Sequence, residues 1–131
     1  MIYEFAVKTE KQNFYNITPQ IVSAIEKSGV TDGLCVVYTT HTTAGITINE
    51  NADPDVVTDM LGAIDALFPQ SAAYRHAEGN TAAHLKSSFV GCSVSLILSD
   101  SHPLLGIWQG VYFCEFDGPR NRRFYVKILK G

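Results

Sequence analysis

The chain has 131 residues, of which 46% are hydrophobic and 18% charged, and its formal net charge is −3. This length suits one domain with a real hydrophobic core, so we expect a single domain over residues 1–131. The acidic balance argues against a general nucleic-acid binder, and no apolar run is long enough to predict a membrane span.

The first half of the chain predicts two short strands, a helix and two further strands. Alternating apolar residues over 3–8 indicate a half-buried strand, and 14–17 is predicted to pair with it. A helix is expected to follow with Thr18 as its N-cap and a proline in its first turn. The apolar runs 34–40 and 43–49 predict the next two strands.

The second half predicts two helices and then three strands. Asp53 has the position of an N-cap, and apolar residues recur after it at helical spacing until Pro69. A shorter helix is capped by Asn80 or Thr81 and closed by Gly91. Strands are predicted after it over 93–99, 108–116 and 124–129, and the last two should form a β-hairpin.

The predicted order is ββαββααβββ, which favours an α+β fold with no strict βαβ alternation. Cys35, Cys92 and Cys114 follow no zinc-finger spacing, so we interpret them as reduced thiols in apolar runs. An N-terminus with several charges lacks the pattern of a signal peptide. Together these features predict a cytoplasmic protein.

Three polar stretches carry the residues that suit chemistry. The first is Thr39-Thr40-His41-Thr42-Thr43-Ala44-Gly45, which follows a predicted buried strand. Polar side chains at a strand end are common in functional sites, because the strand fixes their positions. A turn in which threonine side chains satisfy backbone groups explains this stretch equally well.

The second stretch runs from Tyr74 to Asn80 and is followed by His84. His76 lies in the loop that enters the predicted helix, and His84 lies near its first turn, so the loop could bring both imidazoles together. With His41 they would give three neutral imidazoles, a set that suits Zn²⁺ and a bound water. Each histidine taken alone is more simply a hydrogen-bonded packing residue.

The third stretch lies in and after the strand that begins near Trp108. Gln109 and Glu115 are six residues apart, so on a regular strand they share a face that could line a pocket or a subunit contact. Arg120, Arg122 and Arg123 suit a carboxylate or phosphate ligand. A solvated hairpin tip is an equally good interpretation of these arginines.

Glu50 follows the second central strand and has no capping role of the kind that explains Asp53. We therefore consider it a candidate for orienting a histidine or acting as a general base.

The three stretches together resemble the YjbQ-like family of small bacterial and archaeal proteins. The resemblance rests on HTTAGITINENADPDV (41–56), HAEGNTAAHLKSS (76–88) and LGIWQGVYFCEFDGPRNR (105–122), which occur in the family's order over nearly the whole chain. One departure is Ile107, where the family more often has threonine.

This resemblance implies an α+β fold of two packed β-sheets with flanking helices, assembled as a homotrimer. It implies a weak thiamine-phosphate synthase activity, in which a hydroxymethylpyrimidine diphosphate joins a thiazole phosphate and pyrophosphate leaves. It also implies metal binding through the histidines that match His41, His76 and His84.

The leading hypothesis is therefore a small trimeric enzyme that acts on a small phosphorylated molecule. His41 and Glu50 are the candidate catalytic residues, and His41, His76 and His84 would bind a divalent metal such as zinc, or an anionic group. The candidate substrate-binding residues are Thr43, Asn80, Gln109, Glu115, Arg120 and Arg122. The alternative is a trimer that binds a metal or metabolite without catalysis, and nucleic-acid binding through the C-terminal arginines is the weakest hypothesis.

Overall fold

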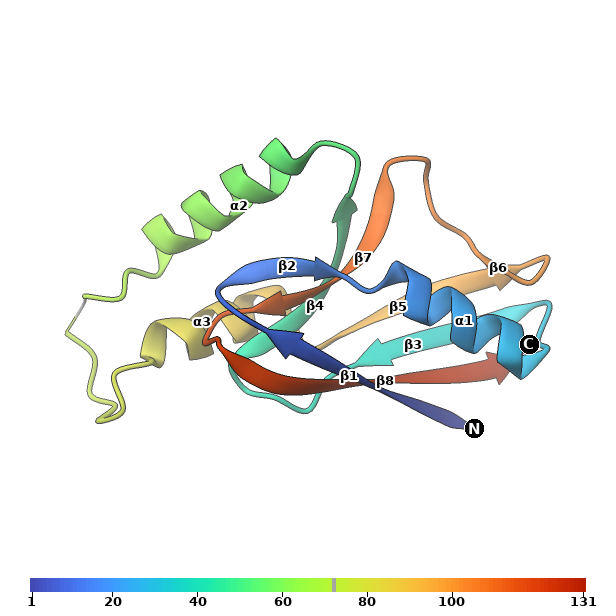
Figure 1. The fold of residues 1–131 in the computed structure, drawn as a ribbon, viewed down its shortest axis with the longest axis horizontal. Helices are drawn as coiled ribbons and strands as arrows, with labels where there is room; N and C mark the ends of the chain where they lie inside the picture. The colour runs from blue at the N-terminus through green and yellow to red at the C-terminus, as the bar shows by residue number, and fades with distance from the viewer. Residues whose placement is uncertain (72) are drawn as a thin grey trace.

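The computed structural model describes residues 1–71 and 73–131, and these form two antiparallel β-sheets and three helices (Figure 1). The predicted α+β class and element order are confirmed, with one two-residue strand added before the last two strands. The elements are β1 (Ile2–Thr9), β2 (Asn13–Asn16), α1 (Thr18–Ser28), β3 (Gly33–Tyr38), β4 (Ala44–Glu50), α2 (Pro54–Leu67), α3 (Thr81–Val90), β5 (Ser93–Ser99), β6 (His102–Pro103), β7 (Gln109–Glu115) and β8 (Arg120–Lys130).

The strands pair differently from the sequence prediction. One sheet has the order β1-β8-β3-β5-β6 and the other has the order β2-β7-β4. The pairing of β1 with β2 and the hairpin of β7 with β8 were therefore both wrong, because each pair of consecutive strands passes from one sheet to the other. Thr9 ends β1 opposite Arg120 at the start of β8, and its Oγ1 accepts a hydrogen bond from the Arg120 N–H at 3.0 Å.

The hydrophobic core lies between the two sheets. Phe113 of β7 and Phe124 of β8 are fully buried, with ring centroids 6.3 Å apart, so aromatic rings connect one sheet to the other. Phe5 of β1 stacks on Phe124 at 5.2 Å. Helix α1 packs its buried residues, Ile21, Ala24 and Ile25, against the same core. Burial of large apolar side chains is the main stabilising contribution in such a core.

The helix starts show one correct prediction and one error. Asp53 is the N-cap of α2, and its Oδ1 accepts a hydrogen bond from the Asp55 N–H at 2.9 Å. Thr18 is not the cap of α1, which begins after Ile17. The Thr18 hydroxyl instead accepts a hydrogen bond from the Val111 N–H at 2.9 Å, so it ties the helix to β7.

Helix α3 is held tightly against the start of β4. The Ser87 hydroxyl donates to the Ala44 carbonyl at 2.6 Å, and the Ile46 N–H donates to the Gly91 carbonyl at 3.0 Å. A Cβ atom on Gly45 would lie 2.8 Å from the Gly91 oxygen, so only glycine permits this approach. The contact places α3 beside the loop that carries His41.

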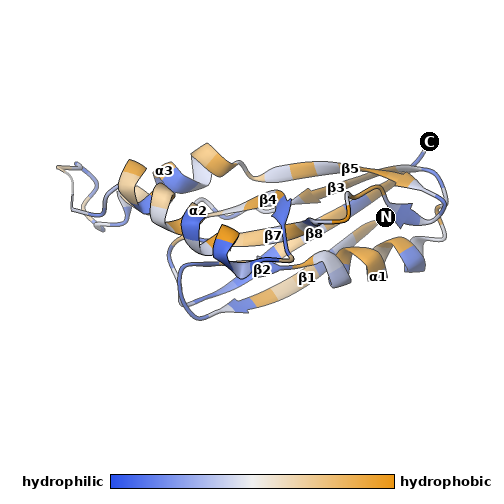
Figure 2. Cartoon of the chain, turned by 90° about the horizontal axis from the view of Figure 1, so that it is seen from above, coloured by the Kyte–Doolittle hydropathy of each residue, from blue (hydrophilic) through white to orange (hydrophobic). Residues whose placement is uncertain are grey.

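The helices α2 and α3 lie at one end of the molecule, and α1 lies towards the other (Figures 1 and 2). Within the residues that the structure describes, no helix combines the length and apolar character needed to cross a membrane.

Candidate functional site

The three predicted histidines meet in one polar cavity of about 390 Å³, which we call the histidine cavity. It forms where the β3–β4 loop, the segment before α3 and the start of β8 come together. Besides His41, His76 and His84, it is lined by Thr42, Thr43, Glu78, Asn80, Asp117, Arg120, Asn121 and Arg122. Residues from distant parts of the chain therefore come together in this cavity.

His76 and His84 lie side by side in this cavity. Their ring centroids are 5.5 Å apart and the ring planes are nearly perpendicular, at 85°. His84 is carried by the first turn of α3, and His76 comes from the loop that precedes the helix. The His76 Nε2 atom also lies 3.9 Å from a carboxylate oxygen of Glu78.

His41 is held by the backbone of β8. Its Nε2 atom accepts a hydrogen bond from the Arg123 N–H at 3.0 Å. Burial lowers the pKa of His41, and the positive charges of Arg122 and Arg123 lower it further, while Glu115 opposes them. The ring is therefore neutral near pH 7, and its Nδ1 atom carries the proton and can donate a hydrogen bond.

Asn80 occupies the N-cap position of α3, but its side chain makes no capping hydrogen bond. Its Nδ2 atom donates to Asp117 Oδ2 at 2.9 Å, and the same oxygen accepts from Arg120 Nη2 at 3.1 Å. Asn80 Oδ1 is buried and has no hydrogen-bond partner among the described residues. The Ala83 N–H donates to the Asn80 carbonyl at 3.0 Å, so the Asn80 amide and the dipole of α3, rather than a free set of backbone N–H groups, are what the helix start offers to an anion.

Asp117 is a site residue that sequence analysis did not select. It lies in the Asp117-Gly118-Pro119 turn, and turn chemistry was a sufficient explanation of that sequence. Burial raises the pKa of Asp117, but hydrogen bonds from Asn80 and Arg120 outweigh burial, so its pKa is lowered overall. The carboxylate orients both of these neighbours beside the histidine cavity.

A buried ion pair lies beneath the cavity. Glu115 is fully buried and Arg122 is 5% exposed. The Glu115 carboxylate accepts hydrogen bonds from Nε and Nη2 of Arg122. It also accepts from the Thr9 hydroxyl at 2.7 Å and from the Asp117 N–H at 2.8 Å. Burial raises the pKa of Glu115, and these hydrogen bonds more than compensate, so the pKa is lowered overall.

This ion pair changes the roles expected for three predicted ligands. Glu115 is fully buried and its oxygens already accept hydrogen bonds within the protein, so it cannot contact a substrate. Arg122 lines the cavity, but its charge is matched by Glu115, and it donates to the Thr43 hydroxyl at 2.8 Å. Glu115, Arg122 and Thr43 therefore hold the base of the cavity in place.

Glu50 and Gln109 are not brought to the histidines. They are register partners where β4 ends and β7 begins, whereas the cavity adjoins Ala44 at the start of β4. Six residues of extended strand separate the two ends by about 20 Å. The Gln109 Oε1 atom accepts the Gly106 N–H at 2.8 Å, which closes the turn before β7.

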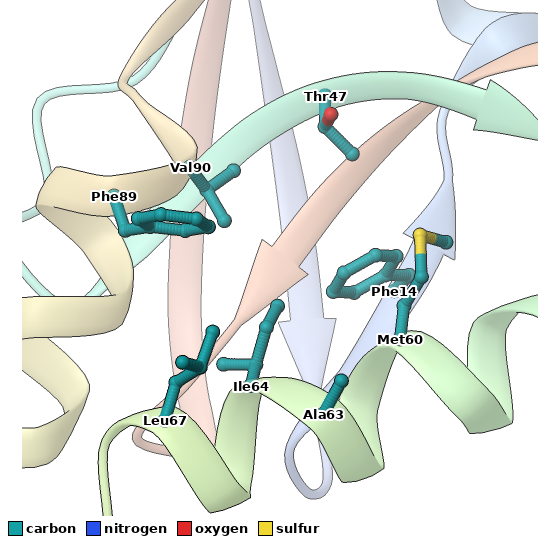
Figure 3. A pocket seen from close by; sticks show the side chains of 8 residues that line it. All are labelled: Phe14, Thr47, Met60, Ala63, Ile64, Leu67, Phe89 and Val90. Atoms are coloured by element: carbon teal, nitrogen blue, oxygen red, sulfur yellow. The ribbon is translucent and has the colours of Figure 1, made fainter.

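A further cavity of about 360 Å³ lies between α2, α3 and β4, and it offers no acid or base (Figure 3). Apolar side chains such as Phe14, Ile64 and Phe89 point into it, and Thr47 is its single polar lining residue. The chemistry of the described residues is therefore concentrated around the histidine cavity rather than here.

Metal binding was predicted for the three histidines. In the described part of the chain, no three His, Cys, Asp or Glu side chains are grouped so that they could hold a metal ion. The hydrogen bond at His41 is a separate obstacle to coordination, because the Nε2 lone pair is already used by the Arg123 N–H. Metal coordination through Nδ1 would put the proton on Nε2 and exclude that hydrogen bond.

Comparison with known proteins places this fold and these motifs in one group. The family model described as UPF0047 protein YjbQ-like matches residues 3–131. The UPF0047 protein MJ1081 of Methanocaldococcus jannaschii is 54% identical over 98% of this chain and 94% of its own length. The UPF0047 protein YugU of Bacillus subtilis is 49% identical over 98% and 99%, respectively.

Solved structures of related proteins share this fold. A protein of the YjbQ/UPF0047 family from Clostridium acetobutylicum superposes with a TM-score of 0.96 at 50% identity, covering 97% of this chain and 99% of that chain. A protein described as YbjQ-like and of unknown function, from Sulfolobus solfataricus, gives 0.95 at 30% identity, covering 100% and 97%.

Removal of one partner of the buried ion pair should be far more harmful than removal of both. Glu115→Ala should lower the free energy of unfolding by about 3–5 kcal/mol, because the Arg122 guanidinium is left buried and unpaired. The double variant Glu115→Leu with Arg122→Met should recover much of that loss. Urea unfolding of the single and double variants measures this coupling, and additive losses would contradict it.

The same ion pair should make stability depend on pH. Because the pKa of Glu115 is lowered by folding, its contribution is complete above the unfolded value, near 4.5, and is lost as the pH falls through the folded value. Urea unfolding at several acidic pH values should show a shallower loss in the double variant than in the wild type.

Proposed function

The chain belongs to the UPF0047 protein YjbQ-like family, and from this premise we propose that it is an enzyme acting on a small phosphorylated molecule in the histidine cavity. The observation that supports this most is the convergence of three imidazoles, Asn80 and Arg120 on one polar cavity. Such a set offers several hydrogen-bond donors to an oxyanion and groups able to transfer protons near neutral pH.

The cavity would recognise a phosphate through its hydrogen-bond donors rather than through an excess of positive charge. Arg120 is balanced by Asp117, and Arg122 is balanced by Glu115, so little free positive charge remains. The N–H of neutral His41 and the side chains of Asn80 and His84 at the start of α3 supply directed donors. Phosphate oxygens accept such hydrogen bonds at helix N-termini without a large excess of cations.

The reaction that we propose is the weak transfer of thiamine-phosphate synthase type that the family resemblance implies. The carbon–oxygen bond to the diphosphate of the pyrimidine substrate breaks, and its electron pair leaves with pyrophosphate. The thiazole nitrogen forms the new carbon–nitrogen bond. The N–H of His41 and the Arg120 guanidinium would hydrogen-bond to the departing pyrophosphate and offset its developing charge.

The test measures pyrophosphate release and phosphate affinity in the same set of proteins. His41→Ala should slow the reaction by about a hundredfold, since one directed donor is lost where charge develops. Arg120→Ala should weaken binding of inorganic phosphate in calorimetry. His102→Ala is the matched control, because His102 lies on β6 outside the cavity lining, and it should behave as the wild type.

Two other outcomes have distinct meanings. Phosphate binding that depends on Arg120, without any turnover, would favour the alternative of a non-catalytic metabolite-binding protein. Failure of the wild type to bind inorganic phosphate at all would contradict the proposed function in both forms.

Metal binding is a second candidate, supported by the contact between the His76 and His84 rings. Two neighbouring imidazoles could serve as metal ligands, but His41 could serve as a third through Nδ1 only after it gives up the Arg123 N–H. We therefore expect nitrogen NMR of wild-type protein to show His41 neutral near pH 7, with the proton on Nδ1. Elemental analysis of protein purified without chelator or affinity tag is the companion measurement.

Stoichiometric zinc in the wild type, lost in His84→Ala, together with a His41 proton on Nε2, would favour the metal site and contradict the hydrogen bond to Arg123. Protein without zinc and with the proton on Nδ1 would favour direct recognition of the anion by the histidines.

We also propose that the chain forms the homotrimer that the resemblance implies. The outer face of the five-stranded sheet carries apolar side chains that another subunit would cover. Leu34 of β3 is the register partner of Ile97 on β5 and of Leu129 on β8. All three side chains are exposed, at 46%, 56% and 46%. A row of exposed apolar side chains across three strands is typical of a surface that meets a partner.

Light scattering after size-exclusion chromatography should give the mass of three chains for the wild type and of one chain for Leu34→Glu. Leu67→Glu is the control, because Leu67 is also exposed, at 61%, but lies on α2. A monomeric wild type would contradict the proposed assembly.

The three cysteines support a proposal of a cytoplasmic location. Cys35, Cys92 and Cys114 are all free thiols in the structure, two of them in the core, which is the state that a reducing compartment maintains.

A further inference from the structure

A second cavity of about 560 Å³ adjoins the histidine cavity, and the two share His41, Thr42 and His84. Hydroxyl groups dominate the rest of its lining, so we call it the hydroxyl cavity. Its lining residues beyond the shared ones are Tyr38, Thr39, Thr40, Ser87, Ser88, Gly91 and Cys92. No carboxylate, ammonium or guanidinium group is among them, whereas the histidine cavity contains two of each sign.

We propose that the two cavities together hold one substrate, a phosphate ester or diphosphate ester of an uncharged, polar organic group. The phosphate occupies the histidine cavity, the organic group occupies the hydroxyl cavity, and the bond between them lies beside His41 and His84. This inference rests on the proposed function and adds to it the class of substrate and the direction in which the substrate lies.

The charge difference between the cavities gives the substrate its orientation. Arg120 and the N-terminus of α3 lie on the side of the histidine cavity and favour the anionic end. A second charged group in the hydroxyl cavity would lose water and gain no counter-ion, which is costly. The organic end is therefore uncharged.

The hydroxyl groups of the lining can hydrogen-bond to a polar organic end. Thr40 and Ser88 are both exposed, one on the β3–β4 loop and one on α3, and a hydroxyl can both donate and accept. The Ser87 and Thr39 hydroxyls donate to the Ala44 and Arg123 carbonyls, so those two side chains are fixed and keep lone pairs for a ligand donor. The combined space is within the usual range for a small-molecule site.

The two histidines that the cavities share would lie beside the bond that the reaction breaks. His41 and His84 line both cavities, so they flank the place where a phosphate in one would be joined to an organic group in the other. A proton donor or acceptor is needed at that junction when the ester bond breaks.

Calorimetry with two probes, inorganic phosphate and ribose 5-phosphate, tests the proposal. We expect the wild type to bind ribose 5-phosphate about tenfold more tightly than phosphate, because only the ester reaches the hydroxyl cavity. Ser88→Trp should remove that advantage by filling the hydroxyl cavity, and should leave the affinity for phosphate within about twofold. Leu85→Trp is the control, since Leu85 is exposed on the same helix and lines neither cavity.

Cys92 provides an independent readout that needs no substitution. It is exposed and lines the hydroxyl cavity, while Cys35 and Cys114 are fully buried. Burial raises the pKa of the Cys35 thiol to about 11 and raises that of Cys114 as well, so neither reacts readily in the folded protein. Ribose 5-phosphate should slow alkylation of Cys92 by iodoacetamide, and phosphate should not.

The outcomes separate this inference from the proposed function. If phosphate binds, but ribose 5-phosphate binds no more tightly and leaves Cys92 alkylation unchanged, the two-cavity substrate is overturned and the phosphate site stands. If neither probe binds, both the inference and the proposed function fail. An advantage of ribose 5-phosphate that Ser88→Trp does not reduce would also overturn the inference.

Discussion

The carboxylate of Glu115 and the guanidinium of Arg122 form an ion pair closed off from water, and both sheets are attached to it. Glu115 belongs to the three-stranded sheet and Arg122 to the five-stranded sheet. Thr9 and Thr43 satisfy the remaining hydrogen bonds from β1 and from the loop after β3. A buried pair of this kind adds little stability over apolar residues, but it is costly to leave half-satisfied. It therefore specifies one arrangement of the two sheets, and with it the position of the His41 loop.

The chemical character of the site follows from that arrangement. The charged side chains near the cavity are paired with one another, Glu115 with Arg122 and Asp117 with Arg120. Asp117 also accepts a hydrogen bond from Asn80. The groups left to meet a ligand are the three imidazoles, of which that of His41 is neutral, the Asn80 amide and the exposed side of the Arg120 guanidinium. A site of this kind recognises the directions of oxygen lone pairs more than it attracts negative charge, and it is consistent with a chain whose net charge is −3.

Much of this could be predicted from the sequence, for reasons that are local. The periodicity of apolar residues predicted the strands and helices, and Asp53 was identified as a cap because capping depends on neighbours in the chain. His41, His76 and His84 were selected by their polar surroundings, and they line one cavity.

Thr18 was misjudged because its hydroxyl bonds to Val111 on β7, a contact between residues far apart in the sequence. Strand pairing failed for the same reason, since alternation shows which face is buried but not which strand lies beside it. The distance of Glu50 and Gln109 from the histidines followed only once the β4–β7 register was known.

The place of β8 in its sheet has a consequence for how the chain is made. β8 is the last strand of this sequence, yet it lies between β1, which is the first, and β3. While the ribosome is still adding residues, β1 has no neighbour and one edge of β3 is bare. Such unpaired edges invite association with other nascent chains. The five-stranded sheet, the Glu115–Arg122 pair and the histidine cavity can therefore form only after β8 has left the ribosome, however early the other strands are made.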